Sequence, residues 1–387
     1  MVFDAEHKSF GNMVAGQKTA SLHRVAAYDM ARGMGIIFVV IGHTLPMDTY
    51  GRALIYSFHM PLFFIISGAV MRRERLSGSL WDRICTSLHS ERKLFANYIF
   101  YSLCFLVYDL IVRYFYLRQM GKRDLVWDVY QTLVLYGINV LWFLVTLVVA
   151  KAVTSILASY VQSELYLVGI AILMYMVFAF VGNYVTARVQ PFSVMKVIYY
   201  PLTACIEILT MTPFVLLGYV AHVYLPAVID RFKFLLPLLI VPNVIWCFAF
   251  GAADYHMLRA SFPPLSLLLA ITGTMAVFGI GVIVHNIPLI SDILNWSSRN
   301  SLFIMVTHEY LLIGYFIIEP ILYRFNIGDN ALYIAIHVIL LIVIEVPLCH
   351  YFKPMADKCI GRMFDLTSRC GRHSRSSDEE VAGIRQY

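Results

Sequence analysis

The chain has 387 residues, of which 60% are apolar and only 14% are charged. A soluble domain carries about 25% charged residues, so this composition, with a mean hydropathy of +0.72, excludes an ordinary soluble domain. The net charge of +6 reflects basic residues near the ends of membrane spans and gives no indication of nucleic-acid binding. The seven cysteines show no paired disulfide framework.

Apolar stretches recur along the chain at a length that suits a membrane. A bilayer core about 30 Å thick needs roughly 20 apolar residues for each helical span. The sequence therefore predicts an all-α, polytopic transmembrane bundle of about ten spans. These expected spans are residues 33–50, 53–71, 95–117, 141–160, 164–183, 200–222, 234–251, 264–285, 301–323 and 331–352.

The polar segments define the expected organisation around this bundle. Residues 1–24 form a polar N-terminal segment, residues 25–352 the membrane domain, and residues 353–387 a basic, partly disordered tail. Most Lys and Arg residues fall on the cytoplasmic side if the N-terminus is cytoplasmic. An even number of spans then places both termini in the cytoplasm, although the basic cluster at 113–123 falls on the opposite side.

Three ionisable residues mark the first expected span: Asp29 and Arg32 at its opening, and His43 within it. A charge within a span costs about 2.5–3.5 kcal/mol and is a functional candidate by default. Arg32 and His43 are eleven residues apart, which is about 16 Å along a helix and nearly the same face. Asp29 is spaced to pair with Arg32. This pattern favours Arg32 as an anion-binding group at one end of the helix and His43 as a titratable base deeper in. The same residues also fit interfacial anchors, Arg32 and Asp29, and a histidine that caps the far end of the span.

The second span contains His59, Pro61 and Ser67. A proline inside a helix frees a backbone carbonyl near residue 57 and kinks the helix. The pattern predicts a polar notch beside His59, with Ser67 as a small contact residue. A packing kink with a hydrogen-bonded histidine is the alternative interpretation.

Further polar residues fall in or beside later spans. Glu207 is an isolated acid within a span and needs a partner or a water-filled cavity. His308 and Glu309 lie within the ninth expected span, after Arg299. Trp142 begins the fourth span, where tryptophan is common at the membrane interface without any chemical role. Glu309 has the alternative of a structural pair with another polar group, and Arg299 that of an anchor at the membrane surface.

Several common catalytic patterns do not occur in the sequence. It contains no phosphate loop of the P-loop type and no Gly-x-Ser-x-Gly elbow, and no Cys/His cluster has metal-ligand spacing. We therefore expect no metal, and chemistry that depends on scattered histidines, arginines and acids.

These residues carry a resemblance to a known family. Arg32, ten intervening residues and His43 resemble the signature of the membrane acyltransferase 3 family, and the run from Phe58 to Gly68 resembles its second span. The resemblance is to the fucose 4-O-acetylase-like branch, which includes polysaccharide O-acetyltransferases. Weaker similarities are found at 141–144, 217–219, 299–302 and 308–309. Asn97 stands where family members often have proline before a tyrosine.

The resemblance implies an acyl-CoA-dependent O-acyltransferase of the bacterial inner membrane. It would move an acetyl or short acyl group from cytoplasmic acetyl-CoA, its co-substrate, to a sugar hydroxyl of a cell-surface or secreted glycan, or of a lipid-linked sugar. His43 would be the catalytic base or an acyl carrier, supported by Arg32 and Asp29. The donor would bind Arg32, Arg72, Arg73 and Arg299; the acyl path or acceptor site would include His59, Ser67, Trp142, Glu207, His308 and Glu309.

A second interpretation is a transporter or flippase for a lipid-linked sugar or a small anion, because charged residues within spans suit transport as well. The sequence shows no inverted repeat of the kind many secondary transporters have, which favours the enzyme.

Overall fold

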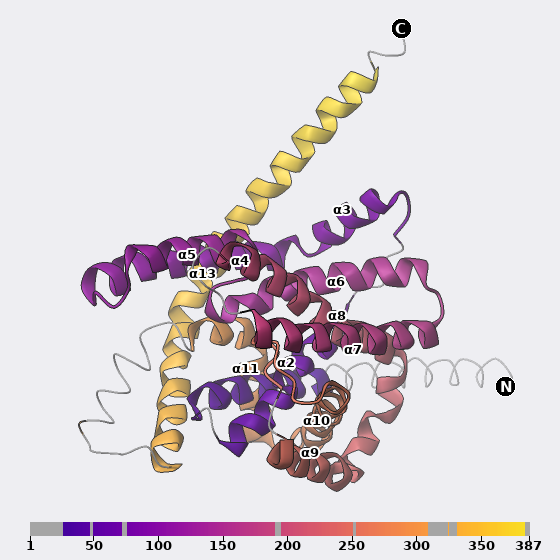
Figure 1. Cartoon of the computed structure of the whole chain (residues 1–387), viewed down its shortest axis with the longest axis vertical. Coiled ribbons are helices and arrows are strands. Elements are labelled where there is room, and N and C mark those ends of the chain that lie inside the picture. Colours follow the sequence, from indigo (N-terminus) through magenta and orange to yellow (C-terminus); the bar gives the residue numbers. More distant parts are fainter. Residues whose placement is uncertain are drawn as a thin grey trace, which may run out of the picture.

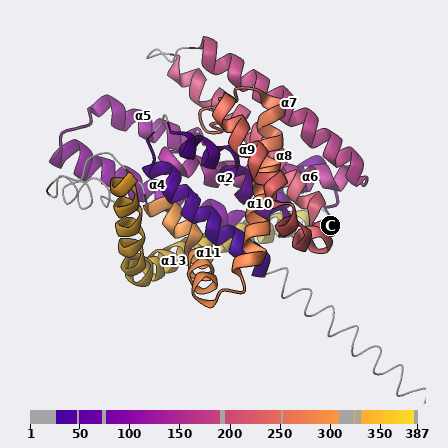
Figure 2. The ribbon, with the colours of Figure 1, turned by 90° about the horizontal axis from the view of Figure 1, so that it is seen from below.

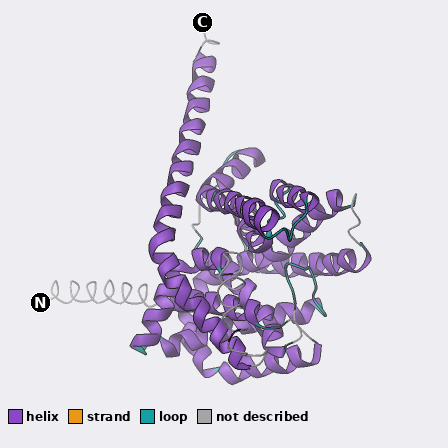
Figure 3. Ribbon diagram, turned by 90° about the vertical axis from the view of Figure 1, so that its left-hand side faces the viewer, coloured by secondary structure: helices purple, strands orange, loops and turns teal. Residues whose placement is uncertain are grey.

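The computed structural model describes residues 26–46, 49–71, 76–189, 195–250, 253–308, 324 and 331–383, with side chains as far as residue 363. The regular structure of these residues is helical, and their β-type pairing is limited to one isolated bridge between Asp254 and Arg259. Figure 3 shows helices throughout the bundle. The predicted all-α class is confirmed.

The chain begins its described part with a helix over residues 26–44, called here helix 26–44. The following elements are α2 (Tyr50–Ala69), α3 (Leu80–Ser90), α4 (Arg92–Tyr108), the π-helical η1 (Asp109–Tyr116), α5 (Lys122–Leu133), η2 (Asn139–Leu141), α6 (Trp142–Tyr160), α7 (Glu164–Arg188), α8 (Lys196–Val228), η3 (Ile229–Phe234), α9 (Leu236–Phe250), α10 (Pro263–Val284), α11 (Pro288–Thr307) and α13 (Ala331–Gly383).

Seven helical stretches in the described part of the chain are long and apolar enough to cross a membrane. They are Tyr50–Ala69, Arg92–Tyr116, Asn139–Tyr160, Glu164–Arg188, Lys196–Ala221, Pro263–Val284 and Leu332–Met363. Each corresponds to one of the ten predicted spans. Of the other three, the expected span 234–251 is the shorter helix α9, 33–50 overlaps helix 26–44, and 301–323 lies mostly outside the described residues.

Two helices extend beyond their predicted limits. Helix α11 begins at Pro288 rather than near residue 301, because proline suits the first turn of a helix and one face of the polar run that follows, with Ser297, Ser298 and Asn300, is buried within the bundle. Helix α13 continues to Gly383, where the sequence predicts a partly disordered tail from residue 353. In Figure 1 this C-terminal part of α13 projects away from the bundle.

The centre of the bundle is the pair α2 and α8, which also contact α6, α7, α9 and α10. The two helices touch backbone to backbone at two glycines. A Cβ atom on Gly68 would overlap the carbonyl oxygen of Val215, and one on Gly218 would overlap that of Ile65. Small residues at such positions let membrane helices approach closely. Figure 2 shows α2 and α8 within the surrounding helices.

The bundle has two ends, which we name after residues of helix 26–44. The His43 end includes Thr49 and the start of α2, the segment before α6 and the segment 253–262, which contribute to one cavity described below. The Arg32 end includes the C-terminal ends of α2 and α8, where His222 bonds the Ala69 carbonyl at 2.6 Å. Helix 26–44 runs between these ends and packs against α11 at Gly33, where a Cβ atom would overlap the Leu294 carbonyl.

Replacing Gly218 by alanine should destabilise the protein, because the new methyl group would clash with the backbone carbonyl of Ile65, which cannot move aside as a flexible side chain could. Overpacking of this kind costs about 1–3 kcal/mol or more. We expect a clear fall in the melting temperature of the detergent-purified protein.

Gly169 in α7 provides a matched control, since no atom lies within 4 Å of a Cβ built there. Gly169→Ala should be neutral or slightly stabilising, because alanine is favoured over glycine in a helix by about 1 kcal/mol. Equal melting temperatures for the two variants would contradict the close α2–α8 contact.

Candidate active site

The His43 end contains a cavity of about 670 Å³, a size that suits a small-molecule site. Its walls come from helix 26–44, α2, η2, α6, α9 and the segment 253–262. Polar and aromatic side chains face it, among them His43, Arg52, Tyr56, His59, Trp142 and His256. Tyr50 and Met257, which also line it, are 59% and 48% exposed, so the cavity is accessible from the surface.

Two histidines of the cavity wall, His43 and His59, form a cluster with His308, which packs behind His43. His43 lies in the last turn of helix 26–44, and its ring contacts that of His308 at 5.0 Å between centroids, edge to face. Tyr56 on α2 lies between His43 and His59. Its ring centroid is 6.0 Å from that of His43 and 4.8 Å from that of His59. The chain therefore brings residues 43, 59 and 308 together from three helices.

The backbone fixes the orientation of two of these rings. His59 Nδ1 is 2.8 Å from the carbonyl oxygen of Ile55, and His308 Nδ1 is 3.0 Å from that of Ile304. A carbonyl oxygen only accepts, so each Nδ1 must carry the hydrogen. In the neutral ring, Nε2 is then the nitrogen that accepts a proton. Both side chains are buried, which suits groups that hold or move a proton away from bulk water.

Arg52 brings a positive charge to the same cavity. Its guanidinium donates to the carbonyl of Leu45 at 3.0 Å and to the hydroxyl of Tyr56 at 2.8 Å. It also lies 4.5 Å from the centroid of the Tyr56 ring. The sequence did not point to this residue, because a basic residue at a span end is typical of a membrane anchor.

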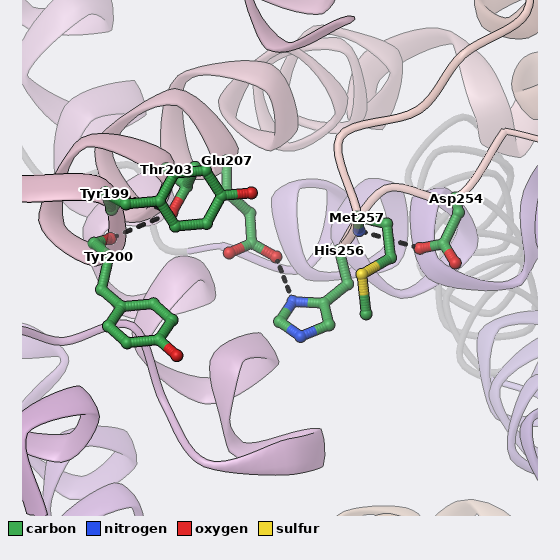
Figure 4. A network of polar contacts seen from close by, with 7 residues as sticks. All are labelled: Tyr199, Tyr200, Thr203, Glu207, Asp254, His256 and Met257. Atoms are coloured by element: carbon green, nitrogen blue, oxygen red, sulfur yellow. Dashed lines mark hydrogen bonds and ion pairs between the residues drawn. The ribbon is translucent and has the colours of Figure 1, made fainter. Parts of the chain in front are cut away.

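Another part of the cavity is lined by His256, whose imidazole pairs with a buried carboxylate. Glu207, on α8, is 1% exposed and bonds His256 Nδ1 through Oε1 at 3.0 Å. The His256 ring stacks on Trp142, with centroids 5.1 Å apart and planes 12° apart. Figure 4 shows Glu207 reaching from α8 toward the imidazole on the neighbouring segment. The partner that a buried acid at position 207 requires is therefore His256, which sequence reasoning left outside the site.

The segment 253–262 holds His256 in a defined conformation. Asp254 and Arg259 exchange backbone hydrogen bonds at 2.7 and 2.9 Å. The side-chain amide of Asn183, on α7, donates to the Ala260 carbonyl at 2.6 Å and accepts from its N–H at 2.8 Å. Leu258 has a φ of 51° and packs under Gly182. These contacts make the segment a fixed turn.

The family described as "Acyltransferase domain" (acyltransferase 3) matches residues 25–350. The chain belongs to this acyltransferase family. No curated protein and no solved structure matches it. The match includes His43, His59, His256 and His308, so the whole cavity lies within the acyltransferase domain.

Some predicted site residues of this acyltransferase lie away from the cavity. Arg32 is half-buried near the other end of helix 26–44, and Ser67 is half-buried near the C-terminal end of α2. Asp29 accepts a hydrogen bond from Ser298 at 3.0 Å, and in the described part of the chain no ion pair joins it to Arg32. The close packing of Gly33 on Leu294 brings α11 beside helix 26–44, and Ser298 of α11 takes the place of Arg32 as a partner of Asp29.

Arg299 is exposed on α11, and Lys353 donates to its carbonyl at 2.9 Å. Arg72, Arg73 and Glu309 lie outside the described residues. Among the residues that are described, no group of three or more His, Cys, Asp or Glu side chains could hold a metal ion.

A second, largely apolar cavity of about 430 Å³ lies between helix 26–44, α11 and α13. Ile36 and Val40 line it, so it runs beside the stretch of helix between Arg32 and His43. Glu345 on α13 is its buried acid and accepts from the Thr307 hydroxyl at 2.8 and 2.9 Å. Sequence reasoning missed Glu345, although an acid within an apolar span is the same signal that singled out Glu207.

Replacing Asn183 by alanine should loosen the turn that carries His256. Both backbone groups of Ala260 would lose their partner, and an unsatisfied buried group costs about 1–3 kcal/mol. We expect faster amide exchange at residues 254–260 and a lower melting temperature. Tyr184→Ala, at an exposed position on the same helix, is the control, and unchanged exchange in Asn183→Ala would show that the clamp is not needed.

Proposed function

We propose that the protein is an integral-membrane O-acyltransferase that moves an acetyl or short acyl group from acyl-CoA to a sugar hydroxyl of a cell-surface or secreted glycan, as in the fucose 4-O-acetylase-like branch of its family. The observation that carries this proposal is the position of His43. In a chain of an acyltransferase family, it lies in a surface-accessible cavity, in ring contact with His308 and near His59.

The proposed chemistry uses the imidazole of His43 as general base and then as general acid. It takes the proton of the sugar hydroxyl while the hydroxyl oxygen attacks the acyl carbonyl carbon. The carbon–sulfur bond of the thioester breaks, and the imidazolium returns the proton to the thiolate. The products are the sugar ester and CoA. A relay through an acyl group carried by His43 would use the same residue in two steps.

The neighbours of His43 suit this chemistry. Negative charge develops on the carbonyl oxygen during attack, and fixed donors or cations near that oxygen stabilise it. Arg52, held by Leu45 and Tyr56, is a fixed cation at the same cavity. His59 and His308 are oriented by their backbone hydrogen bonds, and in this proposal they lie beside the acyl group of the donor.

Arg32 and Arg299 are the donor-binding candidates among the described residues. Arg32 is about three helical turns, or about 16 Å, from His43. A donor whose phosphates lie at the Arg32 end would have to extend its long, thin pantetheine arm along helix 26–44. Under this proposal the Arg32 end and both termini lie on the cytoplasmic side of a bacterial inner membrane, and the acceptor binds at the His43 end.

Replacing His43 by alanine should abolish acyl transfer, because general acid–base catalysis contributes about 10²–10⁴ in rate. The measurement is thiol release from acetyl-CoA by purified protein in detergent, with a glycan fraction from the host as acceptor. His350→Ala, at an exposed position on α13, is the matched histidine control and should retain full activity.

A stable, fully active His43→Ala variant would contradict the proposed mechanism. If neither the wild type nor the control released thiol with several acyl donors, the weight would shift to the alternative of a transporter or flippase for a lipid-linked sugar or small anion, which should show no acyl transfer.

Arg32→Ala should weaken donor binding while the cavity at the His43 end stays intact. Loss of a charge-assisted contact of about 1.5–3 kcal/mol corresponds to a rise in the KM for acetyl-CoA of roughly tenfold or more. The acceptor KM should stay near the wild-type value. An unchanged KM for acetyl-CoA would remove Arg32 from the donor site.

A further inference from the structure

We propose that Asn139, Trp142 and His256 form a binding subsite for the acceptor sugar at the His43 end, with Glu207 as the residue that positions His256. This inference rests on the proposed function and deepens it, because it assigns the part of the cavity that binds the acceptor. The ligand class is an uncharged sugar ring, bound through its hydroxyl groups and its apolar face.

The orientation of His256 suits a hydroxyl group. Because the carboxylate of Glu207 accepts, Nδ1 of His256 carries the hydrogen in their 3.0 Å bond. The other ring nitrogen lies on the opposite edge of the imidazole (Figure 4). In the neutral ring this Nε2 accepts from a sugar hydroxyl, and in the charged ring it donates to a hydroxyl oxygen. His256 lines the cavity, so either state can bind a polyol.

The subsite is rigid before any ligand arrives. His256 stacks nearly parallel on Trp142, and its segment is held by the Asn183 clamp and the Asp254–Arg259 bridge. Little ordering is then needed on binding, and a preorganised site gains affinity for that reason.

Asn139 is an independent observation for the same subsite. It also lines the cavity and is half-buried, with a left-handed backbone at a φ of 50°. No described residue forms a hydrogen bond with its side chain, although an amide can donate two hydrogen bonds and accept others. Non-glycine residues with positive φ gather at functional sites. The backbone thus holds an unused amide against the cavity beside Trp142.

The composition of the subsite matches a sugar better than an ion. A few placed polar groups among aromatic side chains are typical of small-molecule sites, and an aromatic ring offers an apolar face with a negative quadrupole to the C–H groups of a sugar. The charged residues that line the cavity, Arg52, Asp254 and Arg259, are of both signs. His43 lines the same cavity from helix 26–44, so a bound ring can present a further hydroxyl to it.

The test separates acceptor binding from chemistry. Binding of L-fucose, D-glucose and N-acetylglucosamine to the full-length protein is followed by tryptophan fluorescence without any CoA. We expect saturable binding of at least one of these sugars. His256→Ala and Asn139→Gly should each weaken it by about tenfold, as expected for the loss of one or two hydrogen bonds. Asn139→Gly removes the amide but keeps the left-handed backbone free of strain.

Kinetics provide the second readout. In both variants the KM for the glycan acceptor should rise while the KM for acetyl-CoA stays unchanged; Glu207→Gln should raise the acceptor KM less than His256→Ala, because the amide still accepts from Nδ1. His350→Ala is again the control. If His256→Ala fails to fold, Asn139→Gly alone decides the question, because its backbone conformation is kept.

The two proposals fail in different ways. Absence of acyl transfer by the wild type would end the proposed function but leave sugar binding to be measured. Sugar binding and acceptor KM that are the same in wild type and both variants would overturn the subsite and make Trp142 an interface residue. Absence of saturable binding of every sugar by the wild type would overturn it as well.

Discussion

The direct backbone contact between α2 and α8 sets the geometry of the whole site. Gly68 and Gly218 allow this contact near the Arg32 end. The same two helices carry His59 and Glu207 toward the His43 end, where both reach the cavity or its lining. Any side chain at the two glycines would push the helices apart. The separation between the histidine cluster and the Glu207–His256 pair therefore depends on two residues with no chemistry of their own.

The second constraint is that polar groups inside an apolar bundle must find partners within the protein. His59 and His308 bond carbonyls one turn back in their own helices, while Glu207, Glu345 and Asp29 bond residues on other elements. The first solution fixes the orientation of each ring. The second joins elements far apart in the sequence. The same physical requirement thus builds both the site and the tertiary structure around it.

The sequence predicts the helices well because a bilayer demands long apolar runs, and it predicts His43, His59, His308 and Glu207 because ionisable residues are rare in such runs. It does not predict His256, Arg52 or Asn139. These lie in short segments or at span ends, where polar residues are ordinary, and their position depends on contacts such as the Asn183 clamp. The start of α11 was also missed, since a polar run resembles a loop when its burial is unknown.

Helix 26–44 connects two environments that the proposed reaction must keep apart. A highly charged donor such as CoA cannot enter an apolar bundle without a large desolvation cost, and a glycan is too large and polar to cross it. Under the proposed function, the thioester at the end of the pantetheine arm and a sugar hydroxyl at the end of the glycan must therefore meet inside the protein. The cavity at His43 suits this requirement if the donor arm extends along helix 26–44 and the proposed subsite on the fixed turn of 253–262 binds the sugar. A mobile turn would offer the same groups but would have to be ordered at every cycle, so the Asn183 clamp suits the proposed acceptor subsite.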